Sequence, residues 1–129
     1  MPQIKIYGLR ANIEPRRFAL SHAIQAALSA AIGTPDHRRF QRFIILENEN
    51  FIYPSDRTQD YTIIEIIMFE GRSIETKKNL IRLLYQKIAE TTEIRPQDLE
   101  ITIIETPRCN WGIGGVLGDE LKLNYQVDV

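Results

Sequence analysis

The chain has 129 residues, of which 43% are hydrophobic and 26% are charged, a composition typical of one globular domain spanning residues 1–129. Its 16 basic residues nearly balance its 17 acidic ones, so a formal net charge of -1 gives no bulk attraction to nucleic acid or to an acidic membrane. One cysteine and two distant histidines exclude a disulfide framework and a four-ligand zinc site. No apolar run approaches the roughly 18 residues of a membrane span, and the first residues do not read as a secretory signal, so we expect a cytoplasmic protein.

The first half of the chain predicts a strand, a helix and a second strand. Residues 3–9 alternate between apolar and polar side chains, which is typical of a short strand. Apolar residues then recur at helical spacing, and we expect Asn12 to cap the start of this helix and Gly33 to end it. Residues 40–46 are rich in β-branched and aromatic side chains and predict a strand. The polar segment 47–60 predicts a loop with room for a short hairpin.

The second half predicts the same order of elements. Residues 61–69 form the most apolar run and predict a central strand. Ser73 is the expected N-cap of a second helix, which Pro96 ends, and residues 99–104 predict a fourth strand. The glycine-rich segment that follows ends in an alternating run at 121–127, so we expect short C-terminal strands.

The two halves carry matching residues at the positions where helices and strands are expected to begin and end. Segments 2–47 and 61–105 match at an offset of 61 residues, which places Pro35 on Pro96. The sequence therefore predicts an α/β (α+β) fold of duplicated β-α-β units, with a four-stranded core sheet and two helices on one face. Because 61–69 is apolar on both sides, we expect the other face to be apolar and to mediate oligomerisation. A ferredoxin-like sandwich has a similar number of elements and is the alternative.

Pro2 is the strongest candidate for chemistry. Removal of Met1 leaves a free prolyl nitrogen, which is a nucleophilic secondary amine at the start of a strand. An ordinary α-amino group titrates at about 7.7–8.0, close to the range in which a proton shuttle operates. Burial or a nearby cation favours the neutral amine, and a nearby carboxylate favours the protonated one.

Several further motifs follow Pro2 in a fixed order along the chain. They are Arg39-Phe40-Gln41, Arg57-Thr58, Gly71-Arg72-Ser73 with Lys77-Lys78, Pro96-Gln97-Asp98, and Trp111-Gly112. Together with Pro2 and the doubled strand–helix unit, this set resembles the tautomerase superfamily over essentially the whole chain. Within the superfamily it resembles the branch of malonate semialdehyde decarboxylase and its tautomerase-like relatives.

The resemblance implies a β-α-β fold assembled as a homotrimer, with the amino-terminal proline at the base of a pocket. Pro2 is then the catalytic base or acid for a small carboxylated substrate, an enol or keto acid, and no cofactor is needed. Arg72 would hold the substrate carboxylate, since a guanidinium offers paired donors in one plane. Trp111 would form an apolar wall of the pocket, or alternatively a packing anchor between subunits.

Two positions depart from the decarboxylase pattern. Phe69 and Glu70 stand where that enzyme has a second arginine, and Arg38 stands where it has an aspartate. Exchanging an acid for a cation favours a neutral, base-competent proline. This departure from the decarboxylase pattern therefore favours a tautomerase, or another activity on a carboxylated substrate. Arg38 is a candidate second clamp for the substrate carboxylate. A decarboxylase- or hydratase-like activity, and a non-catalytic scaffold trimer that kept the fold, are the alternatives.

Overall fold

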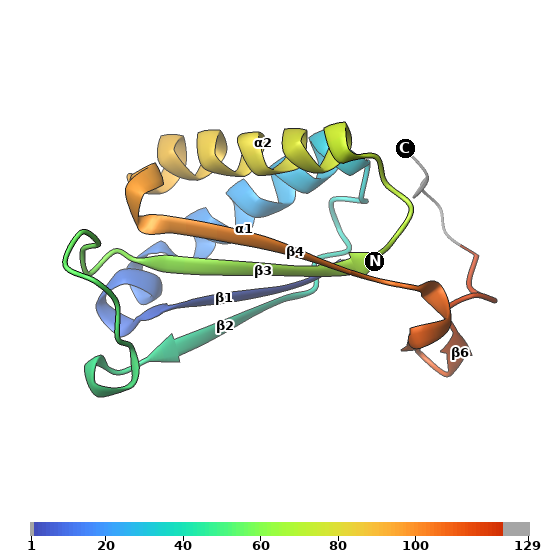
Figure 1. Ribbon diagram of the computed structural model, residues 1–129, viewed down its shortest axis with the longest axis horizontal. Coiled ribbons are helices and arrows are strands. Elements are labelled where there is room, and N and C mark those ends of the chain that lie inside the picture. The colour runs from blue at the N-terminus through green and yellow to red at the C-terminus, as the bar shows by residue number, and fades with distance from the viewer. Residues whose placement is uncertain (1, 123–129) are drawn as a thin grey trace.

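The computed structural model describes residues 2–122, which form a sheet covered on one face by two helices (Figure 1). The sheet has the order β2-β1-β3-β4, with bounds β1 (Gln3–Leu9), β2 (Gln41–Leu46), β3 (Thr62–Phe69) and β4 (Leu99–Thr106). Helix α1 (Arg10–Ile32) connects β1 to β2, and α2 (Ile74–Thr92) connects β3 to β4. Each helix joins two parallel neighbours, whereas the central strands β1 and β3 are antiparallel.

The two halves repeat one another in register as well as in element order. Ile4 pairs with Gln41 and Thr62 pairs with Leu99, at the same separation along the chain. The predicted duplicated β-α-β fold is therefore confirmed. The ferredoxin-like alternative is wrong, because in that fold another strand lies between the two strands of each β-α-β unit.

The hydrophobic core lies between the sheet and the helices. Alternate residues of the strands point toward the helices, and residues three or four apart on each helix point back toward the sheet. Fully or almost fully buried members include Ile4, Ile6, Leu20, Ile24, Ile64, Ile66, Met68, Leu80, Leu84 and Ile88.

Helix α1 begins earlier than predicted. It starts at Arg10 after Leu9, which makes no side-chain capping bond. Asn12 is therefore not the N-cap, and that prediction is wrong. The Asn12 side chain is buried and its Nδ2 donates to the carbonyl of Asp60 (3.1 Å) and to Oγ1 of Thr62 (2.9 Å), so it joins the helix to the start of β3.

The other predicted helix ends are confirmed, with one refinement. Gly33 ends α1 with φ of 69°, in the left-handed region that favours glycine. Ser73 caps α2 by accepting a hydrogen bond from the backbone N–H of Thr76 (3.1 Å). Helix α2 ends at Thr92, before Pro96, which starts the short 3-10 helix η2 (Pro96–Asp98).

The face of the sheet away from the helices is mixed, so the prediction of an apolar face is wrong. Lys5 stands opposite Glu65 on the central strands, and the Tyr7 hydroxyl donates to Glu65 (2.6 Å), a bond that raises the pKa of Tyr7. Arg42 on β2 and Glu100 on β4 are exposed. Apolar side chains lie among these charges, at Ile44, Ile63, Ile67 and Ile104. The β1–β2 side of this face is basic and the β3–β4 side is acidic.

A small hairpin follows the main sheet. After β4 and the 3-10 helix η3 (Arg108–Asn110), strands β5 (Gly112–Ile113) and β6 (Val116–Leu117) pair antiparallel. Gly114 and Gly115 form the turn with positive φ angles of 58° and 88°. Of the predicted strand 121–127, residues 123–127 lie outside the described part of the chain.

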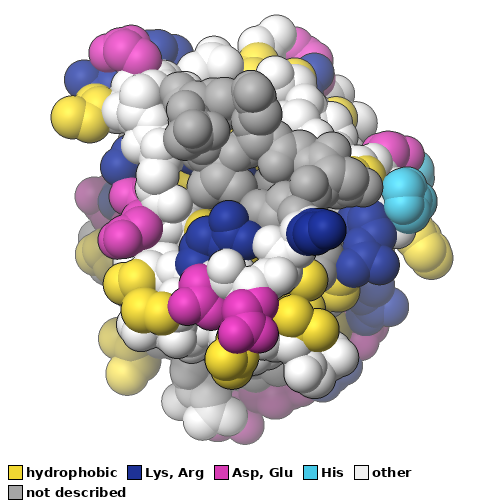
Figure 2. Space-filling model, turned by 90° about the vertical axis from the view of Figure 1, so that its right-hand side faces the viewer, with side chains coloured by type: hydrophobic (Ala, Val, Ile, Leu, Met, Phe, Trp, Pro, Cys, Tyr) yellow, Lys and Arg dark blue, Asp and Glu magenta, His cyan; other side chains and the backbone are white. Residues whose placement is uncertain are grey.

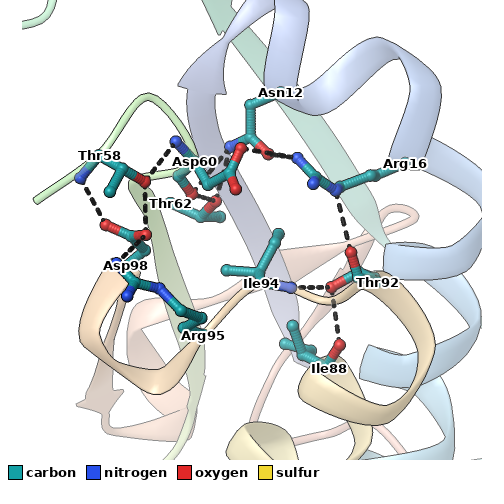
Figure 3. Close-up of polar contacts among 10 residues, drawn as sticks. All are labelled: Asn12, Arg16, Thr58, Asp60, Thr62, Ile88, Thr92, Ile94, Arg95 and Asp98. Atoms are coloured by element: carbon teal, nitrogen blue, oxygen red, sulfur yellow. Dashed lines mark hydrogen bonds and ion pairs between the residues drawn. The ribbon is translucent and has the colours of Figure 1, made fainter.

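The loop between β2 and β3 is a single 3-10 turn, η1 (Asn48–Asn50), and irregular chain, without the short hairpin that the sequence allowed. A buried polar network holds its end (Figure 3). Arg16 donates to Asp60 (2.9 Å) and to the carbonyl of Thr92 (3.0 Å).

Among residues 2–122, no helix is both long enough and apolar enough to cross a membrane.

The buried carboxylate of Asp98 belongs to the same polar network. Its carboxylate accepts hydrogen bonds from the backbone N–H (2.7 Å) and hydroxyl (2.6 Å) of Thr58, and Arg95 lies 3.5 Å away. Burial raises the pKa of a carboxyl group, but here the bonds from Thr58, together with Arg95, bring the pKa of Asp98 below its usual value.

Candidate active site

The topology gathers the predicted site residues at one end of the sheet. Strands β1 and β2 begin at this end, and β3 and β4 end there, because the central pair is antiparallel and each outer strand is parallel to its neighbour. Pro2 is buried directly before β1, Arg72 follows β3, and Trp111 follows β4. The N-terminus and the hairpin accordingly lie at the same end in Figure 1. Three segments far apart in sequence thus lie at the same end of the sheet.

Arg72 is held in the turn between β3 and α2. Its residue is only 5% exposed, and its Nη1 donates to the carbonyl of Phe69 (3.2 Å). Gly71 has φ of 127°, a conformation that side-chain-bearing residues rarely adopt, and Ser73 then caps the helix. The turn therefore fixes a buried guanidinium beside the end of the central strand β3.

Trp111 packs against the same strand end. Its indole Nε1 donates to Oγ1 of Thr106 (2.5 Å), and its ring meets the edge of Phe69 with centroids 5.1 Å apart and planes 76° apart. The backbone N–H of Gly118 donates to the Trp111 carbonyl (2.8 Å). Phe69 is therefore shared: its backbone contacts Arg72 and its ring contacts Trp111.

A small hollow opens at Gln3, the first residue of β1, and Trp111 is the one predicted site residue among its described lining residues. It has a volume of about 40 Å³ and is lined by Gln3, Phe40, Trp111 and Ile113. Arg38 is exposed, and its guanidinium carbon lies 5.2 Å from the centre of the Phe40 ring. The structure thus places Arg38 at the rim of the hollow rather than inside it.

The surface at this end of the molecule is mixed in charge. Seen from this end, lysine and arginine side chains lie across the middle of the surface, with acidic side chains beside them (Figure 2). One ion pair joins Lys77 in the first turns of α2 to Glu105 near the end of β4, with Nζ and Oε1 2.7 Å apart. This pair ties the start of α2 to the sheet next to Arg72.

A larger groove, of about 420 Å³, lies at the opposite end beside the start of α1. Its one arginine, Arg10, is paired with both Glu14 (2.6 Å) and Glu47 (2.6 Å), so no surplus positive charge is directed into the groove. Acidic side chains are present there, but among residues 2–122 no three His, Cys, Asp or Glu side chains are grouped so as to hold a metal ion. The combination of a prolyl residue, a buried arginine and an aromatic wall is found at the other end.

The sequence patterns did not indicate the residues that hold Arg72 and Trp111 at the end of β3. Phe69 was interpreted only as part of a core strand and as a replacement for an arginine, and Thr106 and Arg108 were not singled out. The guanidinium carbon of Arg108 also lies over the Phe69 ring, 5.2 Å from the ring centre. The available signal was local: Arg108 follows Pro107 at the end of a strand and stands three residues before the single tryptophan.

Comparison with known proteins identifies the family. Residues 38–114, more than half of the chain, match the family model described as "Tautomerase enzyme". The chain is 39% identical over 57 residues to a 2-hydroxymuconate tautomerase of Pseudomonas putida, covering 44% of this chain and 90% of that protein. It is 33% identical over 54 residues to a probable tautomerase of Ralstonia nicotianae, covering 42% of this chain and 77% of that protein.

Solved structures share the fold over most of the chain. A structure of malonate semialdehyde decarboxylase matches with a TM-score of 0.78 at 20% identity, covering 87% of this chain and 90% of the other. An asymmetric trimer named F6 fused 4-OT matches with a TM-score of 0.80 at 24% identity, covering 91% and 96%. With the duplicated β-α-β sheet, the family model and the curated relatives in agreement, this chain belongs to the tautomerase superfamily.

Proposed function

We propose that this protein is a tautomerase that uses Pro2 to move a proton on a small enol or keto carboxylic acid. The observation that supports this proposal is that Pro2, the buried Arg72 and Trp111 all lie at the same end of the sheet. The similarity to 2-hydroxymuconate tautomerases supports the reaction class. The proposal requires removal of Met1, which frees the prolyl nitrogen.

The proposed step is a proton transfer without a cofactor. The neutral nitrogen of Pro2 accepts the enol O–H proton, and the carbonyl forms as the C=C electron pair moves to carbon. The same nitrogen then returns the proton to that carbon, so the amine is regenerated. A nearby guanidinium favours the neutral amine, which is the form the first step needs.

Arg72 is proposed to orient the substrate through its carboxylate. A guanidinium fixed by the turn between β3 and α2 loses little freedom when it binds, and its donors match a carboxylate in one plane. Trp111 is proposed as an apolar wall that excludes water and strengthens this charge interaction. Arg38, at the rim, is proposed as a second contact for longer substrates.

We also propose that the chain assembles as a homotrimer. The open sheet face combines isoleucines with a basic side and an acidic side, an arrangement that a second copy can complement. The name of one structure with the same fold describes a trimer, which supports this assembly.

The test is a Pro2→Ala variant assayed for ketonisation of phenylenolpyruvate and of 2-hydroxymuconate. We expect kcat/KM to fall by about 10²–10⁴, the usual contribution of a positioned proton-transfer group. Mass spectrometry of the wild-type protein should find Met1 removed, and light scattering should give Pro2→Ala the same molar mass as wild type.

The alternatives give different results. A wild type that turns over neither enol but releases carbon dioxide from malonate semialdehyde indicates a decarboxylase. A wild type that is inactive on all three compounds, with its assembly intact, indicates a scaffold. Retained Met1, or full activity of Pro2→Ala, contradicts the proposed role of the prolyl nitrogen.

A further inference from the structure

We propose that Arg108 is a positioning residue that holds Trp111 and the C-terminal hairpin against Phe69. This inference rests on the proposed function, because it concerns the Trp111 wall of the same site. Nothing in the family match assigns a role to Arg108. Its contacts connect the end of β3 to the segment that follows the hairpin.

The first contacts of Arg108 are with the segment that follows the hairpin. Its Nε donates to the carbonyl of Gly118 (3.0 Å), and its Nη2 donates to the carbonyl of Leu121 (2.5 Å). A planar guanidinium can serve two carbonyls at once, which anchors the chain as it leaves β6. Because Gly118 also donates to the Trp111 carbonyl, this anchor acts directly on the tryptophan segment.

The second contact is with the sheet. The guanidinium lies over the ring of Phe69, with its carbon 5.2 Å from the ring centre, while Trp111 packs on the same ring edge-to-face. Phe69 is fully buried at the end of β3 and is therefore a fixed support. Arg108 thus holds the hairpin segment through two carbonyls and holds the sheet through a cation–π contact.

The packing at Gly118 shows how little room this arrangement leaves. Gly118 is buried, and a Cβ placed on it would collide with the carbonyl oxygen of Arg108 and come within 2.8 Å of Trp111 Cβ. Gly112, in the same hairpin, has open space around its Cβ position and no positive φ. The two glycines therefore form a matched pair for testing the arrangement.

The experiment uses Trp111 as its own reporter, because it is the single tryptophan of the chain. We would compare the emission maximum and acrylamide quenching of wild type, Arg108→Lys, Arg108→Met and the control Arg82→Met, which changes an exposed arginine of α2. In Arg108→Met we expect a red-shifted emission and stronger quenching. Arg108→Lys should give an intermediate result, because an ammonium keeps the charge over Phe69 but lacks the planar fork. Arg82→Met should match wild type.

Substitution of Gly118 disturbs the packing between Arg108 and Trp111 from the segment that follows β6. Gly118→Ala should change Trp111 emission in the same direction as Arg108→Met, whereas Gly112→Ala should leave it unchanged. Circular dichroism and the thermal midpoint identify any variant that does not fold. If one variant of the pair fails to fold, the other still tests the contact.

Steady-state kinetics then test whether the position of Trp111 affects the proposed reaction. With phenylenolpyruvate, we expect Arg108→Met to lower kcat/KM by about tenfold, mainly through KM, since misplacing a positioning group by about 1 Å can cost up to about a hundredfold. Unchanged emission and quenching in folded Arg108→Met and Gly118→Ala would overturn the positioning role, whatever the activity. Shifted emission supports the positioning role even if the wild type turns over no enol, a result that would instead remove the proposed function.

Discussion

At the scale of the residue, the proposed role of Arg72 in binding a carboxylate depends on how firmly its guanidinium is held. The residue is buried, its Nη1 is bonded to the Phe69 carbonyl, and the helix cap at Ser73 fixes the turn on its other side. A lysine at this position keeps the charge but loses the two parallel donors that match a carboxylate. The identity of the cation, and not only its charge, is therefore expected to matter.

We predict that Arg72→Lys lowers kcat/KM for phenylenolpyruvate by about 10- to 100-fold, the equivalent of a lost charge-assisted hydrogen bond of about 1.5–3 kcal/mol. The selectivity of wild type for the free acid over its methyl ester should fall in the same variant. Arg38→Gln, at the exposed rim, should have a smaller effect on both measurements. An Arg72→Lys enzyme that keeps full selectivity for the acid would show that the carboxylate binds elsewhere.

At the scale of the element, a polar network holds the loop before β3 at the end of the sheet opposite the candidate site. Asp98 precedes β4, accepts two hydrogen bonds from Thr58 in the loop before β3, and has a side chain that is only 1% exposed. Asn12 and Arg16 of α1 bind the neighbouring residues Asp60 and Thr62 (Figure 3). A long loop is thereby joined to both β-α-β units.

We predict that Asp98→Asn lowers the free energy of unfolding by about 1–3 kcal/mol, because the amide cannot accept both bonds from Thr58. The lowered pKa of Asp98 in the folded protein means that the unfolded chain binds this proton more readily. Its stabilising effect is therefore present above the ordinary Asp pKa of about 3.9 and is lost as the pH falls below it.

Urea unfolding at a series of pH values measures this effect. The difference in stability between wild type and Asp98→Asn should be constant near neutral pH and shrink below about pH 4. Asp56→Asn is the matched control, because Asp56 forms an exposed pair with Arg57 and should change stability by less than about 1 kcal/mol. A difference that does not change with pH would show that the charge of Asp98 is not what stabilises the loop.

At the scale of the whole molecule, we propose that copies of the chain associate through the open face of the sheet. Both helices cover one face of the sheet (Figure 1). The other face carries partly buried and exposed isoleucines between a basic side and an acidic side. The Glu65 carboxylate on this face is already bonded to Tyr7 within the chain. The apolar side chains are therefore expected to supply most of the association energy and the charges to set its orientation.

We predict that Ile63→Asp converts the proposed homotrimer to monomers, because it places an unpaired charge in the contact between copies. Ile63 pairs with Tyr7 on the central strands, at the end away from Pro2. Light scattering gives the molar mass, and circular dichroism confirms that the fold is retained. Ala30→Asp, on the exposed side of α1, should leave the molar mass unchanged. Equal molar masses for both variants would exclude this face as the contact.

The sequence by itself determined the elements and their order. Alternation and helical spacing depend on neighbours along the chain, so residues 3–9, the helix ended by Gly33 and the cap at Ser73 could be predicted locally. Pro2 was a candidate from the chemistry of an amino-terminal secondary amine, and the family resemblance added Arg72. The β-α-β pairing followed from the repeated order of elements, because each crossover is long enough to hold a helix and join two parallel strands.

Only the tertiary structure decided what depends on contacts between distant segments. Asn12 is recruited by Asp60 and Thr62 instead of capping its own helix, because burying an amide requires partners that only the folded chain supplies. The strand register, which sets Lys5 opposite Glu65, was needed to establish that charged residues share the open face. In the same way, Arg108 meets Phe69 across 39 positions of the chain, a contact that no local pattern encodes because it depends on where two strands end in space.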